Sequence, residues 1–313
     1  NDSRTVRCRK LGGLGLDAQW NDDFHHSLHT LLTGERNGYY RDYGRLQHLA
    51  KAWQEGFVYS GEYSAFRQRS HGNSSRNIPA HRLVVFAQNH DQVGNRMKGE
   101  RLSSQVSLEK QKLSAASVLL SPFIPLLFMG EAYGERAPFP YFVSHSDPDL
   151  IHAVREGRKR EFSGFQWTGE PPDPQGEETF RQAILHPEQA GKGVHQMLVR
   201  FYQTLIRLRK DLPSLKHLSK ACMRVTPLVK AQVLCVHRFS PPDAVFILFQ
   251  FNNVAGMHPV PLPEGPWDRV LDSSDREWMG PGSQLPARVV SKNGMNTELT
   301  LSAHSAVLLH RET

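Results

Sequence analysis

The sequence predicts an α/β domain built on a parallel sheet, followed by an antiparallel all-β sandwich. Short apolar runs alternate with helical patterns as far as Leu212, and β-branched and aromatic runs replace them after Pro213. Alternating strands and helices are typical of a parallel sheet with covering helices, whereas short strands separated by Gly, Pro, Asn and Asp are typical of a sandwich. The chain has 313 residues. Because one hydrophobic core stops growing at about 250–300 residues, we expect two domains, 1–219 and 220–313.

In the first domain, three apolar runs predict buried strands, and four stretches with apolar residues at helical spacing predict helices. The expected strands are Leu16–Trp20, Leu83–Ala87 and Ile124–Met129. The expected helices are Asp22–Leu32, Arg45–Glu55, Ser107–Leu120 and Gln196–Leu212. Residues 61–79 are rich in Ser, Gly, Asn and Arg and predict a long polar loop, and residues 133–190 show little periodicity.

In the second domain, runs of β-branched, aliphatic and aromatic residues are punctuated by turn residues. The expected strands lie in Val233–Phe239, Ala244–Phe251, Ala287–Val290 and Thr297–His310.

Charge and hydropathy argue against a nucleic-acid or membrane partner. The formal charge is +7, but the basic residues are spread along the chain. The densest cluster, residues 155–160, is interrupted by Glu156, which is typical of a solvated helix face. The longest apolar stretch, residues 115–129, is broken by Ser121, Pro122 and Pro125, and a membrane span needs about 20 apolar residues.

The cysteines indicate a reducing compartment. Cys8, Cys222 and Cys235 are three in number and form no C-x-x-C pair. This usage argues against a disulfide scaffold. No apolar signal segment opens the sequence. We therefore expect a cytoplasmic protein.

The strongest functional signal is the polar string Gln88-Asn89-His90-Asp91, which follows an apolar strand directly. In a parallel α/β barrel the carboxyl ends of the strands form the catalytic face, so His90 and Asp91 are expected to point into a site. A plain strand-to-turn junction is the alternative, because Asn and Asp are common in turns.

Two further strand ends carry polar groups. The run from Asp17 to His26 supplies carboxylates, imidazoles and an indole, which suit hydrogen bonding to sugar hydroxyls and packing against a sugar ring. His25 and His29 have the i, i+4 spacing of some zinc ligands, but the glutamate of a zinc-protease helix is absent, so we expect no metal. Glu131 and Tyr133 follow the third strand and are weaker candidates, since an acid there also suits a helix start.

Together these strings resemble the α-amylase family, glycoside hydrolase family 13. Asn89-His90-Asp91 after an apolar strand is similar to the last signature region of that family. Residues 15–26, 39–43, 89–96, 127–131, 145–148 and 158–162 resemble the members that release trehalose from maltooligosaccharides ending in a trehalose unit. The resemblance covers essentially the whole chain.

The resemblance implies strands six to eight of a (β/α)8 barrel followed by a β-sandwich, and a retaining hydrolase that needs no cofactor. It implies that Asp91 stabilises the oxocarbenium-like transition state, while Asp17 is left a structural role. The implied substrate contacts are Asn21, Asp22, Asp23, Phe24, His25, His90, Asp91, Gln92, Val93, Gly94 and Asn95.

A retaining hydrolase also needs a nucleophile and an acid/base. The resemblance implies that the nucleophilic Asp and the acid/base Glu lie upstream of Asn1, so we expect these 313 residues to be inactive alone. Two alternatives remain: another family member such as a glycogen branching enzyme, and a non-catalytic glucan-binding derivative. The string Asp22-Asp23-Phe24-His25-His26 argues against the branching enzyme.

Overall fold

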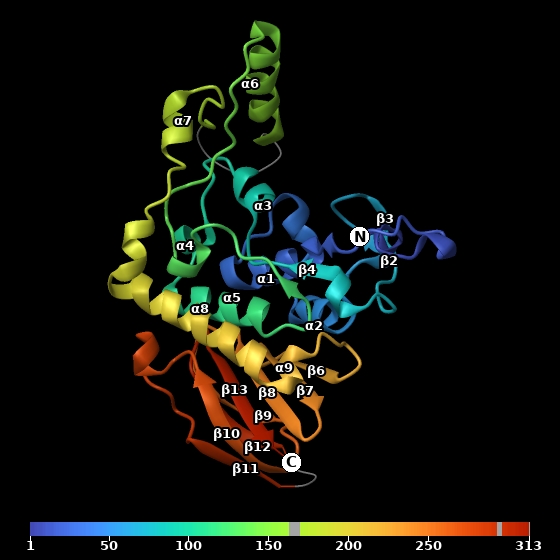
Figure 1. Ribbon diagram of the computed structural model, residues 1–313, viewed down its shortest axis with the longest axis vertical. Coiled ribbons are helices and arrows are strands. Elements are labelled where there is room, and N and C mark those ends of the chain that lie inside the picture. The colour runs from blue at the N-terminus through green and yellow to red at the C-terminus, as the bar shows by residue number, and fades with distance from the viewer. Residues whose placement is uncertain (163–169, 293–295, 313) are drawn as a thin grey trace.

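A computed structural model describes residues 1–162, 170–292 and 296–312. The helices and the short parallel strands of the α/β part lie in the middle of the molecule, above a large antiparallel sheet (Figure 1). An arm that carries α6 (Pro148–Phe162) and α7 (Glu177–Arg181) projects from the opposite side. The predicted order of an α/β part followed by an all-β part is confirmed.

A three-stranded parallel sheet organises the α/β part. Its strands are β1 (Gln19–Trp20), β4 (Leu83–Val85) and β5 (Ile124–Pro125), in the order β1-β4-β5. The strands are shorter than predicted. Leu16 is half exposed and lies outside β1, so the apolar run there does not mark a buried strand.

Helices cover this sheet, and local capping explains where they start and end. They are α1 (Asp22–Thr33), α2 (Leu46–Glu55), α5 (Leu108–Leu119) and α8 (Gly193–Asp211). The Asn21 side chain caps α1 and Ser107 caps α5, each accepting a hydrogen bond from a backbone N–H of the first turn. Gly34 ends α1 in the left-handed conformation, with φ of 80°. All four predicted helices are confirmed, with ends shifted by a few residues.

Two predicted irregular regions contain regular structure. Residues 61–79 include most of a hairpin of β2 (Ser60–Ser64) and β3 (Arg69–Gly72). Residues 133–190 begin at the end of η5 (Glu131–Tyr133) and include α6, α7 and most of η6 (Pro187–Gly191). The hairpin lacks an apolar face of its own, because all but one of its strand residues are exposed or half-buried, so no periodic pattern marked it.

The all-β part is a six-stranded antiparallel sheet in the order β11-β10-β13-β8-β7-β6, with a separate two-stranded sheet β12-β9. The strands are β6 (Met223–Leu228), β7 (Val233–Ser240), β8 (Asp243–Gln250), β9 (Gly256–Val260), β10 (Gly265–Asp272), β11 (Arg288–Ser291), β12 (Thr297–Leu301) and β13 (Ala306–Glu312). The strands β6, β9 and β10 were not among those predicted. The last two contain Pro and Gly and leave about half of their residues open to solvent, which weakens the pattern.

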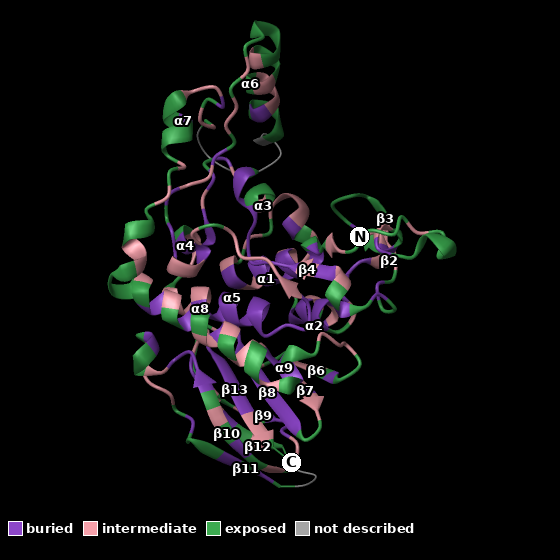
Figure 2. Ribbon diagram, in the orientation of Figure 1, coloured by how far each residue is buried: buried purple, intermediate pink, exposed green. Residues whose placement is uncertain are grey.

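Both faces of the large sheet are covered at its centre, which explains why all eight residues of β8 are buried (Figure 2). One face packs with β9 and β12 around residues such as Phe246 and Trp267. The other face shares a core with the α/β part, where the Phe249 and Trp53 rings lie 5.4 Å apart. Because that core joins the two parts, the division at residues 219 and 220 stays a prediction.

Buried cations also join the two parts. The Lys112 side chain on α5 has no exposed surface, and its Nζ donates hydrogen bonds to the carbonyl oxygens of Ser273 (2.6 Å) and Trp278 (2.8 Å) in the all-β part. In the reverse direction, Arg238 on β7 donates to the Leu120 carbonyl at the end of α5 (2.8 Å). A cation at a helix C-terminus satisfies carbonyl groups that have no partner within the helix.

Candidate functional site

The parallel sheet brings the three predicted polar strings to one edge. β1 pairs with β4 and β4 pairs with β5, all in parallel register. The strands therefore end on the same side, where α1, α3 (His90–Gly94) and η5 begin. The three polar strings therefore follow strand ends that lie on the same side of the sheet.

His90 and Asp91 form the accessible centre of this edge. Their side chains are 59% and 58% exposed, and His90 Nε2 lies 3.4 Å from Asp91 Oδ1. The Asn89 side chain caps α3 by accepting a hydrogen bond from the Gln92 N–H (2.8 Å). This cap fixes the helical turn that carries His90 and Asp91. An exposed carboxylate and imidazole on a capped turn can hydrogen-bond a ligand that approaches from solvent.

Three further side chains surround this pair. The Trp20 indole at the end of β1 is 41% exposed, and its ring centroid lies 5.5 Å from that of His90. Gln92 Nε2 donates to Asp22 Oδ1 (3.2 Å), which connects the strand ends of β4 and β1. Trp20 is not among the individual contacts that the resemblance implies, but it supplies the indole that the sequence analysis expected to pack against a sugar ring.

Several predicted contacts instead support the backbone. Asn21 is fully buried and donates to the Gly56 carbonyl (2.9 Å) while it caps α1. Asp23 is 2% exposed and accepts hydrogen bonds from the N–H groups of Val58 (2.6 Å) and Tyr59 (2.9 Å). These two residues fix the chain from α2 to β2 against the start of α1.

Phe24 and His25 are also buried. Phe24 has no exposed surface and lies in the main core, with the Phe123 ring 6.3 Å away. His25 is 2% exposed and its ring contacts the Ala87 carbonyl and the Tyr40 hydroxyl. The structure therefore separates them from the open surface that His90 and Asp91 form, because consecutive residues of a helix point in different directions.

The residues at the end of α3 also differ in their exposure to solvent. Val93 and Gly94 are buried, and the Gly94 carbonyl accepts a hydrogen bond from Arg158 of α6 (2.9 Å). Asn95 is exposed. Of the predicted contacts, the accessible or half-buried ones are Asp22, His90, Asp91, Gln92 and Asn95.

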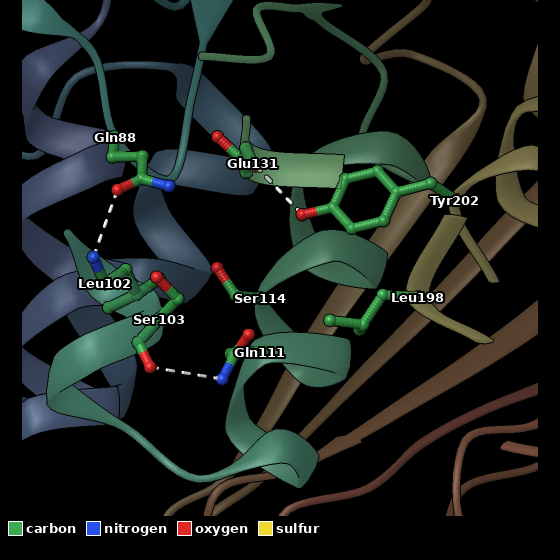
Figure 3. Close-up of a pocket in the computed structure, with 8 residues that line it drawn as sticks. All are labelled: Gln88, Leu102, Ser103, Gln111, Ser114, Glu131, Leu198 and Tyr202. Carbon is green, nitrogen blue, oxygen red and sulfur yellow. Dashed lines mark hydrogen bonds between the residues drawn. The ribbon is translucent and has the colours of Figure 1, made fainter. Parts of the chain in front are cut away.

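Glu131 lies away from this surface in a small cavity between Gln88, which follows β4, and the helices α4 (Leu102–Gln105), α5 and α8 (Figure 3). Tyr202 donates to its Oε1 (3.0 Å) and the Phe128 N–H to its Oε2 (3.2 Å). Burial raises the pKa of Glu131 to about 7. The cavity has room for about one water molecule, so the structure favours a structural role for Glu131.

Tyr133 is half-buried, and its hydroxyl donates to Glu135 (3.0 Å) rather than to any group at the strand-end surface. Gly130 makes the local turn possible. Its φ is 83°, and a Cβ there would lie only 2.6 Å from that of Glu135.

The described part of the chain contains no group of three or more His, Cys, Asp and Glu side chains placed to hold a metal ion. Nor does any helix in that part have the length and apolar character needed to cross a membrane.

Comparison with known proteins identifies the relatives of this chain. It is 46% identical over 211 residues to a malto-oligosyltrehalose trehalohydrolase of Saccharolobus solfataricus and 46% identical over 215 residues to one of Arthrobacter ramosus. The chain is homologous to part of these trehalohydrolases. The matches cover 67% and 68% of this chain but only 36% and 37% of the relatives, so the chain spans little more than a third of their length. No family model matches the chain.

Solved structures support the same fold. A putative α-amylase from Salmonella typhimurium superposes with a TM-score of 0.77 at 34% identity, over 94% of this chain and 47% of that one. An α-amylase from H. orenii superposes with a TM-score of 0.53 at 18% identity, over 99% of this chain and 51% of that one. The chain therefore has the α-amylase fold over its length: a partial α/β barrel followed by an antiparallel β domain.

Proposed function

We propose that this chain forms the glucan-binding face of a retaining glycosidase that hydrolyses the α-1,4 bond next to the terminal trehalose of maltooligosyltrehalose and releases trehalose. The observation that carries the proposal is the exposed pair His90 and Asp91 at the end of the central strand. The identity of 41–46% to proteins named as malto-oligosyltrehalose trehalohydrolases supports it.

In this proposal Asp91 stabilises the positive charge that develops on the sugar ring, and His90 hydrogen-bonds the same sugar. A carboxylate held on a capped helical turn needs little reorganisation in the transition state, which is the source of electrostatic catalysis. Trp20 offers its indole face to the ring, and Asp22 and Gln92 contact hydroxyls of the neighbouring unit. Asn95 extends the contacts along the glucan.

The proposal places β1, β4 and β5 as the sixth to eighth strands of the barrel, with the nucleophilic Asp and the acid/base Glu on earlier strands. Retaining hydrolysis needs those two carboxyl groups about 5–5.5 Å apart. The 313 residues alone are then expected to bind glucan weakly and to hydrolyse nothing. Asn21, Asp23, Phe24, His25, Val93 and Gly94 shape the site from beneath rather than by contact.

The test uses the natural full-length protein with maltooligosyltrehalose, and trehalose is measured by chromatography. Asp91→Asn is expected to lower kcat by about 10²–10³-fold, since that is the usual cost of removing one preorganised electrostatic group. Asp17→Asn is the matched control, because Asp17 is exposed and has been assigned no site role.

Each alternative outcome has a distinct meaning. Transfer of glucan chains without trehalose release would indicate a branching enzyme, and glucan binding without any product would indicate a binding protein. Equal activity of Asp91→Asn and wild type would show that Asp91 is not catalytic. We also propose a cytoplasmic location, which the three free thiols Cys8, Cys222 and Cys235 support.

A further inference from the structure

The segment that carries His90 and Asp91 is held at both ends by one group of buried or largely buried side chains. At its start, the Ala87 carbonyl lies 2.8 Å from His25 Nδ1. At its end, Arg96 Nη1 donates to Glu35 Oε2 (2.8 Å). His25 lies on α1, and Glu35 follows the end of that helix. Helix α1 and the turn that follows it therefore anchor the two ends of the segment.

The two anchors are connected to each other. A carbonyl only accepts hydrogen bonds, so His25 Nδ1 carries the proton and its Nε2 accepts from the Tyr40 hydroxyl (3.2 Å). The Tyr40 ring stacks on the His29 ring with centroids 4.5 Å apart. His29 Nε2 lies 2.8 Å from the same Oε2 of Glu35 that Arg96 contacts. We call these side chains the anchor cluster: His25, His29, Glu35, Tyr40 and Arg96.

Charge and burial make Glu35 the central member of the anchor cluster. The side chains of His29, Glu35 and Arg96 are only 5%, 11% and 14% exposed. Although burial opposes ionisation, hydrogen bonding from His29 and the charge of Arg96 hold the pKa of Glu35 at about 2. The carboxylate is thus ionised at neutral pH, and the weak screening around it strengthens its interaction with Arg96.

The segment between the anchors depends on such support. α3 has only five residues, and so short a helix is not stable by itself. Its exposed face carries His90 and Asp91, so it receives little support from packing there. A small displacement of a reacting group costs up to about 10²-fold in rate.

We infer that Glu35 is a positioning residue, which acts through Arg96 to fix the segment from Gln88 to Asn95 and so the placement of Asp91. Glu35 belongs to the buried anchor cluster and not to the exposed surface, so it does not contact the sugar. The expected effect of Glu35 on catalysis rests on the proposed function, whereas the anchoring of the segment does not depend on it.

The kinetic test compares Glu35→Gln with wild type in the natural full-length protein. The amide preserves size and removes the charge. We expect kcat for trehalose release to fall about 10–100-fold while KM changes less than about threefold, because the loss concerns alignment in the transition state rather than binding. Glu35→Asp, which retains the charge, is expected to recover part of kcat. Glu177→Gln is the control, since it removes an exposed ion pair with Arg181 on α7.

A double-mutant cycle tests the route through Arg96. If Glu35 acts through that guanidinium, Glu35→Gln and Arg96→Gln together cost little more than either alone. Additive losses in kcat would overturn this route.

Hydrogen exchange of the backbone amides of residues 88–96 tests the anchoring without substrate. Glu35→Gln is expected to speed exchange in this segment and to leave that of β7 and β8 unchanged. Unchanged exchange in the segment, or equal acceleration throughout the protein, would overturn the inference. If wild type releases no trehalose while Glu35→Gln still loosens the segment, the proposed function fails and the anchoring stands.

Discussion

Replacing Glu131 by Gln should change how the stability of the protein depends on pH. Glu131 is 8% exposed and lines the small cavity beside Tyr202 (Figure 3). Burial penalises the charged carboxylate more than the hydrogen bonds of Tyr202 and Phe128 favour it, so its pKa rises from 4.5 to about 7. A glutamine resembles the protonated acid in shape and carries no charge at any pH.

The pKa difference sets the expected magnitude. Each pKa unit corresponds to about 1.4 kcal/mol, so a rise from 4.5 to about 7 amounts to about 3 kcal/mol. Between these values the folded protein holds a proton that the unfolded chain has released. The Glu131 contribution to the free energy of unfolding therefore falls as pH rises from about 4.5, and it levels off above about 7. In Glu131→Gln this position makes no pH-dependent contribution to the free energy of unfolding.

The assay is urea unfolding of wild type and Glu131→Gln from pH 5 to pH 8 in the full-length protein. We expect similar free energies of unfolding near pH 5, and a variant more stable than wild type by up to about 3 kcal/mol at pH 8. A difference between the two proteins that stays constant with pH would refute the reasoning.

Glu135 provides a control of opposite sign. It is 1% exposed, and although burial opposes ionisation, the N–H groups of Ala137 and His186 hold its pKa at about 2. Its contribution to stability is present above pH 4.5 and is lost as pH falls towards 2. Glu135→Gln should therefore be less stable than wild type at pH 7, with a difference that narrows at low pH.

Two further substitutions test packing, each by urea unfolding at pH 7. Lys112→Met removes two hydrogen bonds to buried carbonyls and should lower the free energy of unfolding by about 2–4 kcal/mol. The control is Lys159→Met at an exposed site. If the two variants unfold at the same urea concentration, Lys112 does not join the two parts of the protein. Phe24→Ala should lower the free energy of unfolding by about 3–5 kcal/mol, as for other buried aromatic residues. In the protein that remains folded, KM for the glucan should be unchanged. A large rise in KM with little loss of stability would instead show that Phe24 contacts the sugar.

Much of the fold could be predicted because its signals are local. The apolar spacing of α1, α2, α5 and α8 is visible in the sequence, and so is the continuous apolar run of β8. The hairpin of β2 and β3 and the strands β6, β9 and β10 were missed. All but a few of their residues are exposed or half-buried, and β9 and β10 pair with strands that lie far along the chain. Whether such a segment forms a strand depends on its neighbours in the sheet more than on its own residues.

The sequence predicted which short polar stretches form the candidate site, but not which of their side chains are exposed. The sequence placed polar groups at three strand ends, and the structure gathers those ends at one edge. The sequence alone could not show that Asp22 and Asp23, which are neighbours on α1, differ in exposure. One is exposed and the other is buried against the backbone of Val58 and Tyr59, and that difference depends on how α1 packs.

The sequence by itself determined that an α/β part precedes an all-β part, and it determined the strand-end motif Asn89-His90-Asp91 and the family resemblance, since each depends only on residues close together in the chain. Only the tertiary structure decided which of the polar residues reach solvent, because exposure depends on contacts between segments far apart in sequence. It also decided that Glu35 and Arg96, separated by 61 positions, meet beneath the segment that carries Asp91. Such a pairing has no local signal, because it exists only after α1 and the segment following β4 are brought together.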